Sequence, residues 1–194
     1  MAVRSHAQLK QLLDELYHRY SRPVFLSTSA LSIPHQYASP EDREIAAFVT
    51  ASLAYGNVKQ IHRSANTALD AMGDSPAEFI RRFDPTRDPA RLQHFVHRFN
   101  SGLDLALLCH LLHQAIAAEG SLQAFFLKGY DPTHDDIEPA LNSLVKRMLS
   151  LDVSAFYPSG TLPAKAGVRF FFPSPAQGSA CKRLNLFLRW MVRR

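Results

Sequence analysis

Three residues near the end of the chain are of the types that bind a phosphate group. Gly178 and Ser179 stand directly ahead of a helix predicted to begin at about Ala180. Gly178 allows a tight backbone turn, and Ser179 is a residue type that caps helices. Lys182 falls in the first helical turn, where unbonded N–H groups already attract anions. The sequence therefore predicts a phosphate-binding site at this turn.

The predicted helix is apolar on one side and cationic on the other. At about 100° per residue, the side chains of Lys182, Arg189 and Arg193 fall within about 40° of one another. The inner side is formed by Leu184, Phe187, Leu188 and Met191. Trp190 lies about 80° from Lys182, outside this stripe, and we expect it to be partly exposed. With Arg183, the outer cations extend the predicted nucleic-acid-binding surface along the helix.

The charge of the chain is concentrated at this end. Of a net charge of +5, the stretch from Val153 to Arg194 supplies seven Lys and Arg side chains and no Asp or Glu. The residues before it carry 15 basic and 17 acidic side chains, a net charge of −2. A one-sided field attracts polyanions because each neutralised phosphate releases counterions. DNA is the expected partner, and the alternatives are a solvated basic tail or an acidic protein partner.

Cys181 offers a second kind of chemistry at the same turn. In the first helical turn beside Lys182 and Arg183, its thiolate is predicted to be favoured by the helix dipole and by both cations, as in reactive cysteines. A small side chain packed beneath the preceding loop is the commoner explanation for a cysteine at such a position. No histidine adjacent in sequence could act as its base.

The segment CHLLH, residues 109–113, has Cys and His spacings that zinc sites use, and His94 and His97 precede it. Cys109 and His110 point about 100° apart on a helix, however, and the segment is rich in leucine. Buried core side chains explain this pattern better than a metal site. No metal site is predicted, and without a GxGxxG, P-loop or GxSxG motif no cofactor is predicted either.

Composition limits the class of protein. With 194 residues, 46% of them hydrophobic, the chain can bury one sizeable core. No apolar run approaches the roughly 18 residues of a membrane helix, and the start MAVRSHAQLKQLL lacks the apolar stretch of a signal peptide. The two cysteines suit a reducing compartment. We therefore expect a cytoplasmic protein without a membrane partner, whose oligomeric state the sequence leaves open.

Helix start and stop signals fill the chain up to about residue 155. Ser39 before Pro40, and Asn57 after Gly56, are pairs that begin helices. We expect helices over residues 5–20, 40–55, 58–72, 102–118 and 134–151, and shorter ones after Ser75, Asp88 and Ser121. The first helix carries one apolar stripe and is expected to pack by it: Leu9, Leu12, Leu13, Leu16 and Tyr20.

The helical pattern fails between Tyr157 and Ser179. Seven helix breakers fall in this stretch: Pro158, Gly160, Pro163, Gly167, Pro173, Pro175 and Gly178. Within it, VRFFFP is predicted to be a short extended piece that packs its aromatic rings on the body. The sequence thus predicts one all-α domain over residues 1–194: a helical body at 1–155, a long loop at 156–179 and a basic amphipathic helix at 180–194.

Four motifs resemble a bacterial family catalogued as a conserved domain of unknown function: PHQY, SPEDREIAAFVTASLAYGNVKQI, HRF at residues 97–99, and GSACKRLNLFLRWMVR. The resemblance covers nearly the whole chain. Members of that family continue past this point with an Asp-rich segment and a Leu-Asp-Thr-His stretch. The resemblance therefore implies that the chain is truncated just after its last helix.

The order of glycine turn, helix-borne lysine and downstream Asp-Thr-His resembles the helix-hairpin-helix DNA glycosylases. In that superfamily the hairpin holds a DNA phosphate, a lysine attacks C1′ of the flipped nucleotide and an aspartate assists. The resemblance assigns the hairpin to Gly178 and the nucleophile to Lys182, which would form a Schiff base with the opened sugar. SPAQGSACK keeps one glycine of the usual Leu-Pro-Gly-Val-Gly, and the aspartate has no counterpart in this chain.

These observations predict an all-α multi-helix bundle of the helix-hairpin-helix glycosylase type that binds DNA. The complete protein would act in DNA repair on damaged or noncanonical bases, and we expect this shorter chain to lack glycosylase activity. A non-catalytic nucleic-acid-binding module, in which Lys182 contacts only a phosphate or solvent, is the alternative.

Overall fold

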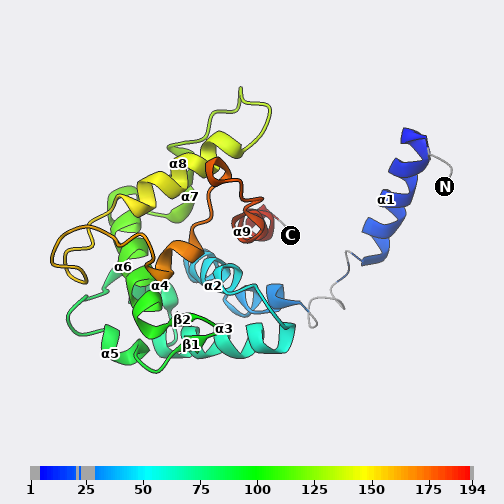
Figure 1. Cartoon of the computed structure of the whole chain (residues 1–194). Coiled ribbons are helices and arrows are strands. Elements are labelled where there is room, and N and C mark those ends of the chain that lie inside the picture. The colour runs from blue at the N-terminus through cyan, green and yellow to red at the C-terminus, as the bar shows by residue number, and fades with distance from the viewer. Residues whose placement is uncertain (1–4, 21, 23–28, 193–194) are drawn as a thin grey trace.

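The computed structural model describes residues 5–20, 22 and 29–192, and the fold over these residues is all-α (Figure 1). Its helices are α1 (His6–Tyr20), α2 (Pro40–Ser52), α3 (Val58–Met72), α4 (Pro76–Arg81), α5 (Pro89–Leu92), α6 (Gly102–Glu119), α7 (Leu122–Leu127), α8 (Glu138–Leu149) and α9 (Lys182–Val192). Four short 3-10 helices join them: η2 (Ala30–Ser32), η3 (Pro34–Gln36), η4 (Gly167–Phe171) and η5 (Pro175–Gln177). The sequence did not predict the two-residue antiparallel hairpin of β1 (Val96–His97) and β2 (Asn100–Ser101).

Helix α6 forms the centre of the body. The helices α4, α5, α7 and η4 all pack against it. Its leucines surround most of its circumference, and an unbroken run of buried residues extends from Asp104 to Leu112. Burial on nearly all sides lets one helix organise the elements around it.

Several predicted helix starts are confirmed by capping hydrogen bonds, whereas Asp88 makes no capping bond and the helix expected from residue 134 begins at Glu138. The Ser39 hydroxyl accepts from the Asp42 N–H at 3.3 Å, and Asn57 Oδ1 accepts from the Lys59 N–H at 2.9 Å. These side chains satisfy N–H groups that a helix leaves unbonded at its start. The start of α7 is held in a further way, because the Glu44 carboxylate of α2 accepts N–H groups at its first turn.

The long loop after α8 is more helical than predicted. VRFFFP was expected to be extended, but most of it lies in η4, whose 3-10 turns let Phe171 and the following Phe172 both point into the core. The prediction that its aromatic rings pack on the body is confirmed for these two. Gly167 brings the loop close to α6, since a Cβ at this position would lie 2.5 Å from Asp104 Oδ1.

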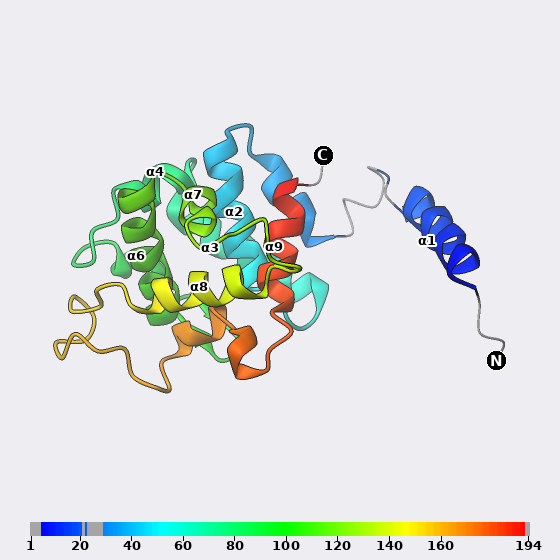
Figure 2. The same ribbon diagram turned by 90° about the horizontal axis from the view of Figure 1, so that it is seen from above.

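Helix α9 lies alongside α2 (Figure 2), and Phe187 packs edge-on against Phe48 with ring centroids 5.1 Å apart. The prediction that Trp190 is partly exposed is wrong, because its side chain is 8% exposed. The fully buried positions are Leu184, Phe187 and Trp190. Because these three residues are spaced three apart, the buried stripe includes Trp190 instead of Leu188, which is half-buried.

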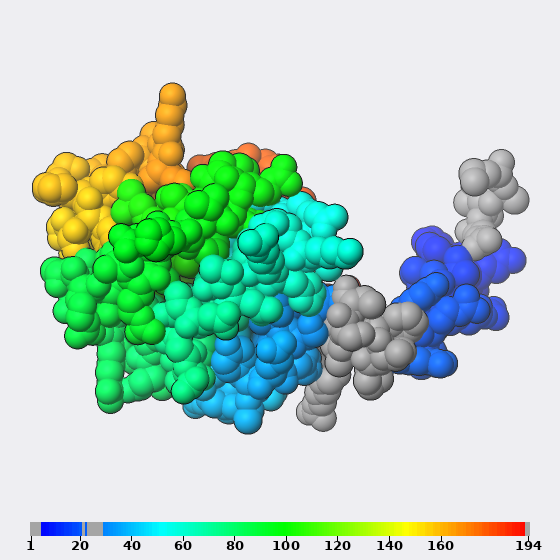
Figure 3. Space-filling view, turned by 90° about the horizontal axis from the view of Figure 1, so that it is seen from below, coloured from blue at the N-terminus to red at the C-terminus, as the bar shows by residue number. Residues whose placement is uncertain are grey.

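Helix α1 forms where the sequence predicts a helix, but the prediction that it packs by its leucine stripe is wrong. None of its residues is buried, and Leu9, Leu13 and Leu16 are exposed. Figures 1 and 3 show α1 standing clear of the body. An apolar period identifies which face of a helix prefers burial, and it does not supply a surface to cover that face.

Candidate nucleic-acid interface

A tight turn over residues 174–181, which we call the hairpin, precedes α9. Gly178 has a φ of +76° in the left-handed region, and its N–H donates to the Pro175 carbonyl at 2.7 Å. Ser179 does not cap the helix as predicted; its hydroxyl accepts from the Cys181 N–H at 3.1 Å, and α9 begins only at Lys182. Cys181 also has a positive φ, of +48°, a conformation that residues other than glycine rarely adopt.

A side chain of α8 fixes this hairpin from outside. Asn142 Oδ1 accepts two hydrogen bonds, one from the Ser174 hydroxyl at 2.8 Å and one from the Ala176 N–H at 2.9 Å. Two hydrogen bonds to one amide oxygen hold the hairpin against the body, so the chain enters α9 from a fixed position.

Of the two interpretations of Cys181, the structure supports the packed side chain and not the reactive thiolate. The side chain is 1% exposed, and its thiol donates to the Pro173 carbonyl at 3.2 Å. Burial raises the pKa of the Cys181 thiol, although Arg183 lowers it in part. A buried neutral thiol is a packing group rather than a nucleophile.

The outer cations of α9 are placed largely as predicted. Lys182 and Arg189 are exposed, while Arg193 lies outside the described residues. Gly178 is exposed, as Lys182 is, and Ser179 is half-buried. Within the described part of the chain, the Lys182 ammonium has no ion-pair partner, and its charge is available to an external anion.

The Arg183 guanidinium is engaged within the protein. It donates to the Ser52 carbonyl at the end of α2, at 3.3 Å, and to the Phe170 carbonyl. It also lies 3.8 Å from the Phe170 ring centroid and 5.2 Å from that of Tyr55. Burial lowers its pKa, yet an arginine stays charged at neutral pH. Arg183 thus joins α9, α2 and η4.

Tyr55 connects the same elements to the β1–β2 hairpin. Its hydroxyl donates to Asn100 Oδ1 at 2.6 Å and lies 3.2 Å from the His97 carbonyl. The Asn100 amide in turn donates to the Gly167 carbonyl at 3.1 Å. Burial raises the pKa of Tyr55 to about 12, so the phenol is neutral and can donate at physiological pH.

His97 lies beneath this network and is fully buried. Its Nδ1 is 2.9 Å from the Ser64 hydroxyl, and its ring packs edge-on against Tyr55 with centroids 4.5 Å apart. Nε2 has no hydrogen-bond partner among the described residues. Burial lowers the pKa of His97, which makes the neutral imidazole the stable form.

The histidines of the CHLLH segment do not meet in a ligand set. His110 is buried between the rings of Phe83 and Phe156, and the Nδ1 of His113 lies 2.9 Å from the Ile80 carbonyl. Cys109 is buried in the core. Across residues 5–20, 22 and 29–192, no three His, Cys, Asp or Glu side chains are grouped as a metal site would need.

Three sequence motifs therefore meet at one place that sequence reasoning did not identify as a site. AYGN supplies Tyr55, HRFN supplies His97 to Asn100, and GSACKR supplies Arg183, with the η4 loop between them. The chain distances are large, and Tyr55 and Asn100 are 45 residues apart. The available signal was that each of the three short motifs contains an aromatic or a basic residue.

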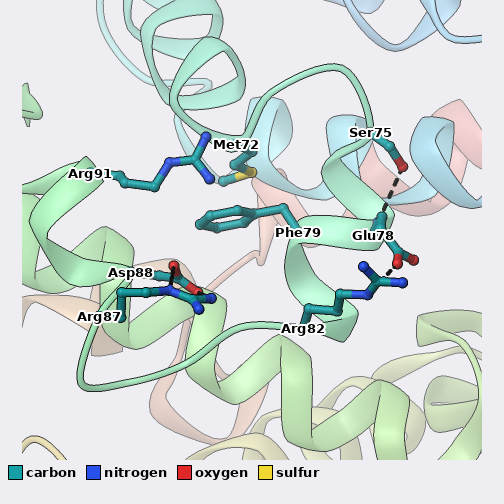
Figure 4. A pocket seen from close by; sticks show the side chains of 8 residues that line it. All are labelled: Met72, Ser75, Glu78, Phe79, Arg82, Arg87, Asp88 and Arg91. Atoms are coloured by element: carbon teal, nitrogen blue, oxygen red, sulfur yellow. Dashed lines mark hydrogen bonds and ion pairs between the residues drawn. The ribbon is translucent and has the colours of Figure 1, made fainter.

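Two other hollows lie on the body. Figure 4 shows a cavity of about 320 Å³ beside α4 and α5, in which Arg82 pairs with Glu78, Arg87 with Asp88, and Arg91 covers the Phe79 ring. Its paired arginines leave little free positive charge. A wider groove of about 740 Å³ between α2, α7 and α9 is mainly apolar, and Arg189 is among the residues that line it.

Comparison with known proteins identifies a family but no activity. The sequence model of one family, described as "Protein of unknown function (DUF2400)", matches residues 30–194. No curated protein matches the chain, and no solved structure matches it. Among the helices that the structure describes, none has both the length and the apolar character needed to span a bilayer.

Proposed function

We propose that this chain, which belongs to the DUF2400 family, binds DNA through the hairpin at residues 174–181 and the outer side of α9. The observation that carries the proposal is the exposed Lys182 at the mouth of the hairpin, in a stretch without acidic residues. Exposed Arg189 continues the positive surface two turns along α9.

The backbone supports the same role. The N–H groups of Lys182 and Arg183 find no acceptor among the described residues, because they begin a helix. A helix start with a lysine beside it suits a phosphate, since the dipole and the ammonium attract the same charge. The hairpin, held by Asn142, keeps this arrangement formed before DNA arrives.

Base excision by Lys182 is the second candidate function. The position of the lysine favours this function. Lys182 directly follows a turn with two positive φ values, at Gly178 and Cys181. Helix-hairpin-helix glycosylases place their nucleophile after such a turn. Because Lys182 is exposed and no carboxylate of the described residues pairs with it, DNA binding without excision is the better-supported function.

Salt-dependent DNA binding tests the main proposal. We expect affinity for duplex DNA to fall steeply with salt, and Lys182→Gln with Arg189→Gln to reduce the slope of log K against log [salt] by about one unit each. Arg63→Gln with Lys146→Gln, which removes two exposed cations from α3 and α8, is the matched control. Salt-independent binding, or equal losses in both double variants, would contradict this interface.

Borohydride trapping tests the second candidate. A covalent adduct with DNA containing a damaged base, lost in Lys182→Gln and kept in Lys146→Gln, would establish Schiff-base chemistry at Lys182. If the chain binds DNA and no lesion in a broad panel yields an adduct, the binding function stands alone. If the chain bound an acidic protein and had no affinity for DNA at low salt, both DNA binding and base excision would be ruled out in favour of a protein-interaction function.

A further inference from the structure

Three aromatic rings form a cluster on the surface beside Arg183. We call Tyr55, Phe99 and Phe170 the aromatic cluster. The Phe99 and Phe170 centroids lie 4.4 Å apart with the rings nearly perpendicular, and Tyr55 stacks on Phe99 at 5.5 Å. Phe99 is 62% exposed and Phe170 is 36% exposed. Two phenylalanines open to solvent side by side form a surface that gains free energy when something covers it.

The aromatic cluster is held in place from below. Tyr55 is fixed by its hydrogen bond to Asn100, and Phe170 is fixed by Arg183, which bonds its carbonyl and covers its ring. Rigid rings lose little conformational entropy on binding a ligand, so they form a site that exists before the ligand arrives.

Phe99 is presented by a strained turn. Arg98, the residue before it, has a φ of +55° in the tight β1–β2 connection, a conformation that is rare for residues other than glycine. Such strain persists only where the surrounding structure imposes it, and it gathers at functional sites. In this turn the strain at Arg98 lies next to the exposed ring of Phe99, which contributes little to the core.

Cations border the exposed rings. Arg98 is exposed next to Phe99, and Arg183 lies over Phe170. Lys182, the predicted phosphate contact, is the neighbour of Arg183 in the chain. Rings with a free face beside positive charges are what proteins use to bind unpaired bases, since the ring stacks on the base and the cations hold the backbone.

We propose that the aromatic cluster binds one unstacked nucleobase of DNA. Tyr55 covers one face of Phe99, so the opposite face is the stacking surface for the base. This inference rests on the proposed DNA-binding function, because the hairpin and Lys182 would hold the phosphates that flank the base. It adds that DNA with a base outside the stack is bound more tightly than a regular duplex.

Binding to two duplexes of equal length, one fully paired and one with a single-base bulge, tests this inference. We expect the 194-residue chain to prefer the bulged duplex by about tenfold or more, as a single stacked base provides. Phe99→Leu removes the ring and keeps an apolar side chain, and it should abolish the preference while leaving affinity for the paired duplex unchanged. Phe99→Trp keeps a stacking face and should retain the preference.

The variants separate the failures of the two proposals. Lys182→Gln should weaken binding to both duplexes by the same factor, because a phosphate contact does not distinguish them. If the parent chain binds neither duplex, the DNA-binding function itself fails. Equal affinity of the parent chain for both duplexes, or an unchanged preference in a folded Phe99→Leu variant, overturns the base-binding role and leaves DNA binding standing.

Discussion

Helices α1 and α9 have the same kind of sequence and different surroundings. Both are amphipathic, both carry basic residues, and the same apolar period predicted each of them. In α9, Leu184, Phe187 and Trp190 are buried, whereas no residue of α1 is. The difference is the receiving surface: α2 lies alongside α9 and meets Phe187 with Phe48. Most helical stability comes from such packing, so the two helices should contribute very differently to folding.

The largest expected effect concerns the apolar faces of the two helices. Phe187→Ala should lower the free energy of unfolding by about 3–5 kcal/mol, because it removes a buried ring and leaves a cavity beside Phe48. Leu13→Ala in α1 should change it by less than about 0.5 kcal/mol, because Leu13 is exposed. Urea unfolding of both variants measures the two values. Similar losses would show that α1 packs on the body in solution.

A smaller effect is expected for the arginine of each helix. Arg183→Met should cost about 2 kcal/mol, because the Ser52 and Phe170 carbonyls lose a charged donor. Arg19→Met should have almost no effect, since Arg19 is exposed on α1. Thermal unfolding compares the pair. An unchanged melting temperature in Arg183→Met would mean that Arg183 does not anchor α9.

The smallest expected effect is a pH dependence of stability, which should arise from buried histidines of the body and not from α1. Burial lowers the pKa of His97 and of His110, so each folded-state value lies below the ordinary value of about 6.5. Their contribution to stability is complete above that pH and is lost as the pH falls through the lowered pKa, because the unfolded chain then binds more protons. Stability should therefore decline between pH 7 and pH 5.

Two histidine variants check this pH dependence by urea unfolding at each pH. His110→Leu should make the decline shallower, since it removes one buried imidazole, and His18→Leu in α1 should leave it unchanged because His18 is exposed. A decline of the same size in His110→Leu would assign the pH dependence to other groups.

Short-range sequence signals predicted the helices, whereas the candidate site depends on contacts between residues that are far apart in the chain. Ser39 and Asn57 begin helices as predicted, because a cap bonds only with residues two or three positions ahead. The exposure of Trp190 was predicted wrongly, since its burial depends on how α9 meets the body. Arg183 was predicted to be a DNA contact, and its engagement with Phe170 follows from where η4 places that carbonyl.

The aromatic cluster could not be predicted by any local rule. Tyr55, Phe99 and Phe170 stand in separate motifs, and no helical or strand period relates them. The β1–β2 hairpin was missed for a similar reason, because two-residue strands give no alternating pattern. The predicted all-α class is confirmed, whereas the relation to helix-hairpin-helix glycosylases stays a prediction.

The hydrogen bonds of Asn142 to Ser174 and Ala176 also affect how the chain can change in length. Because α8 itself fixes the hairpin, the position of the hairpin does not depend on the length of the loop between them. The tip of that loop, at residues 158–161, is exposed. Closing a longer flexible loop costs only about 0.6 kcal/mol for each doubling of its length. Insertions beside Gly160 should therefore be tolerated in engineered variants and among relatives, with the hairpin and α9 unmoved.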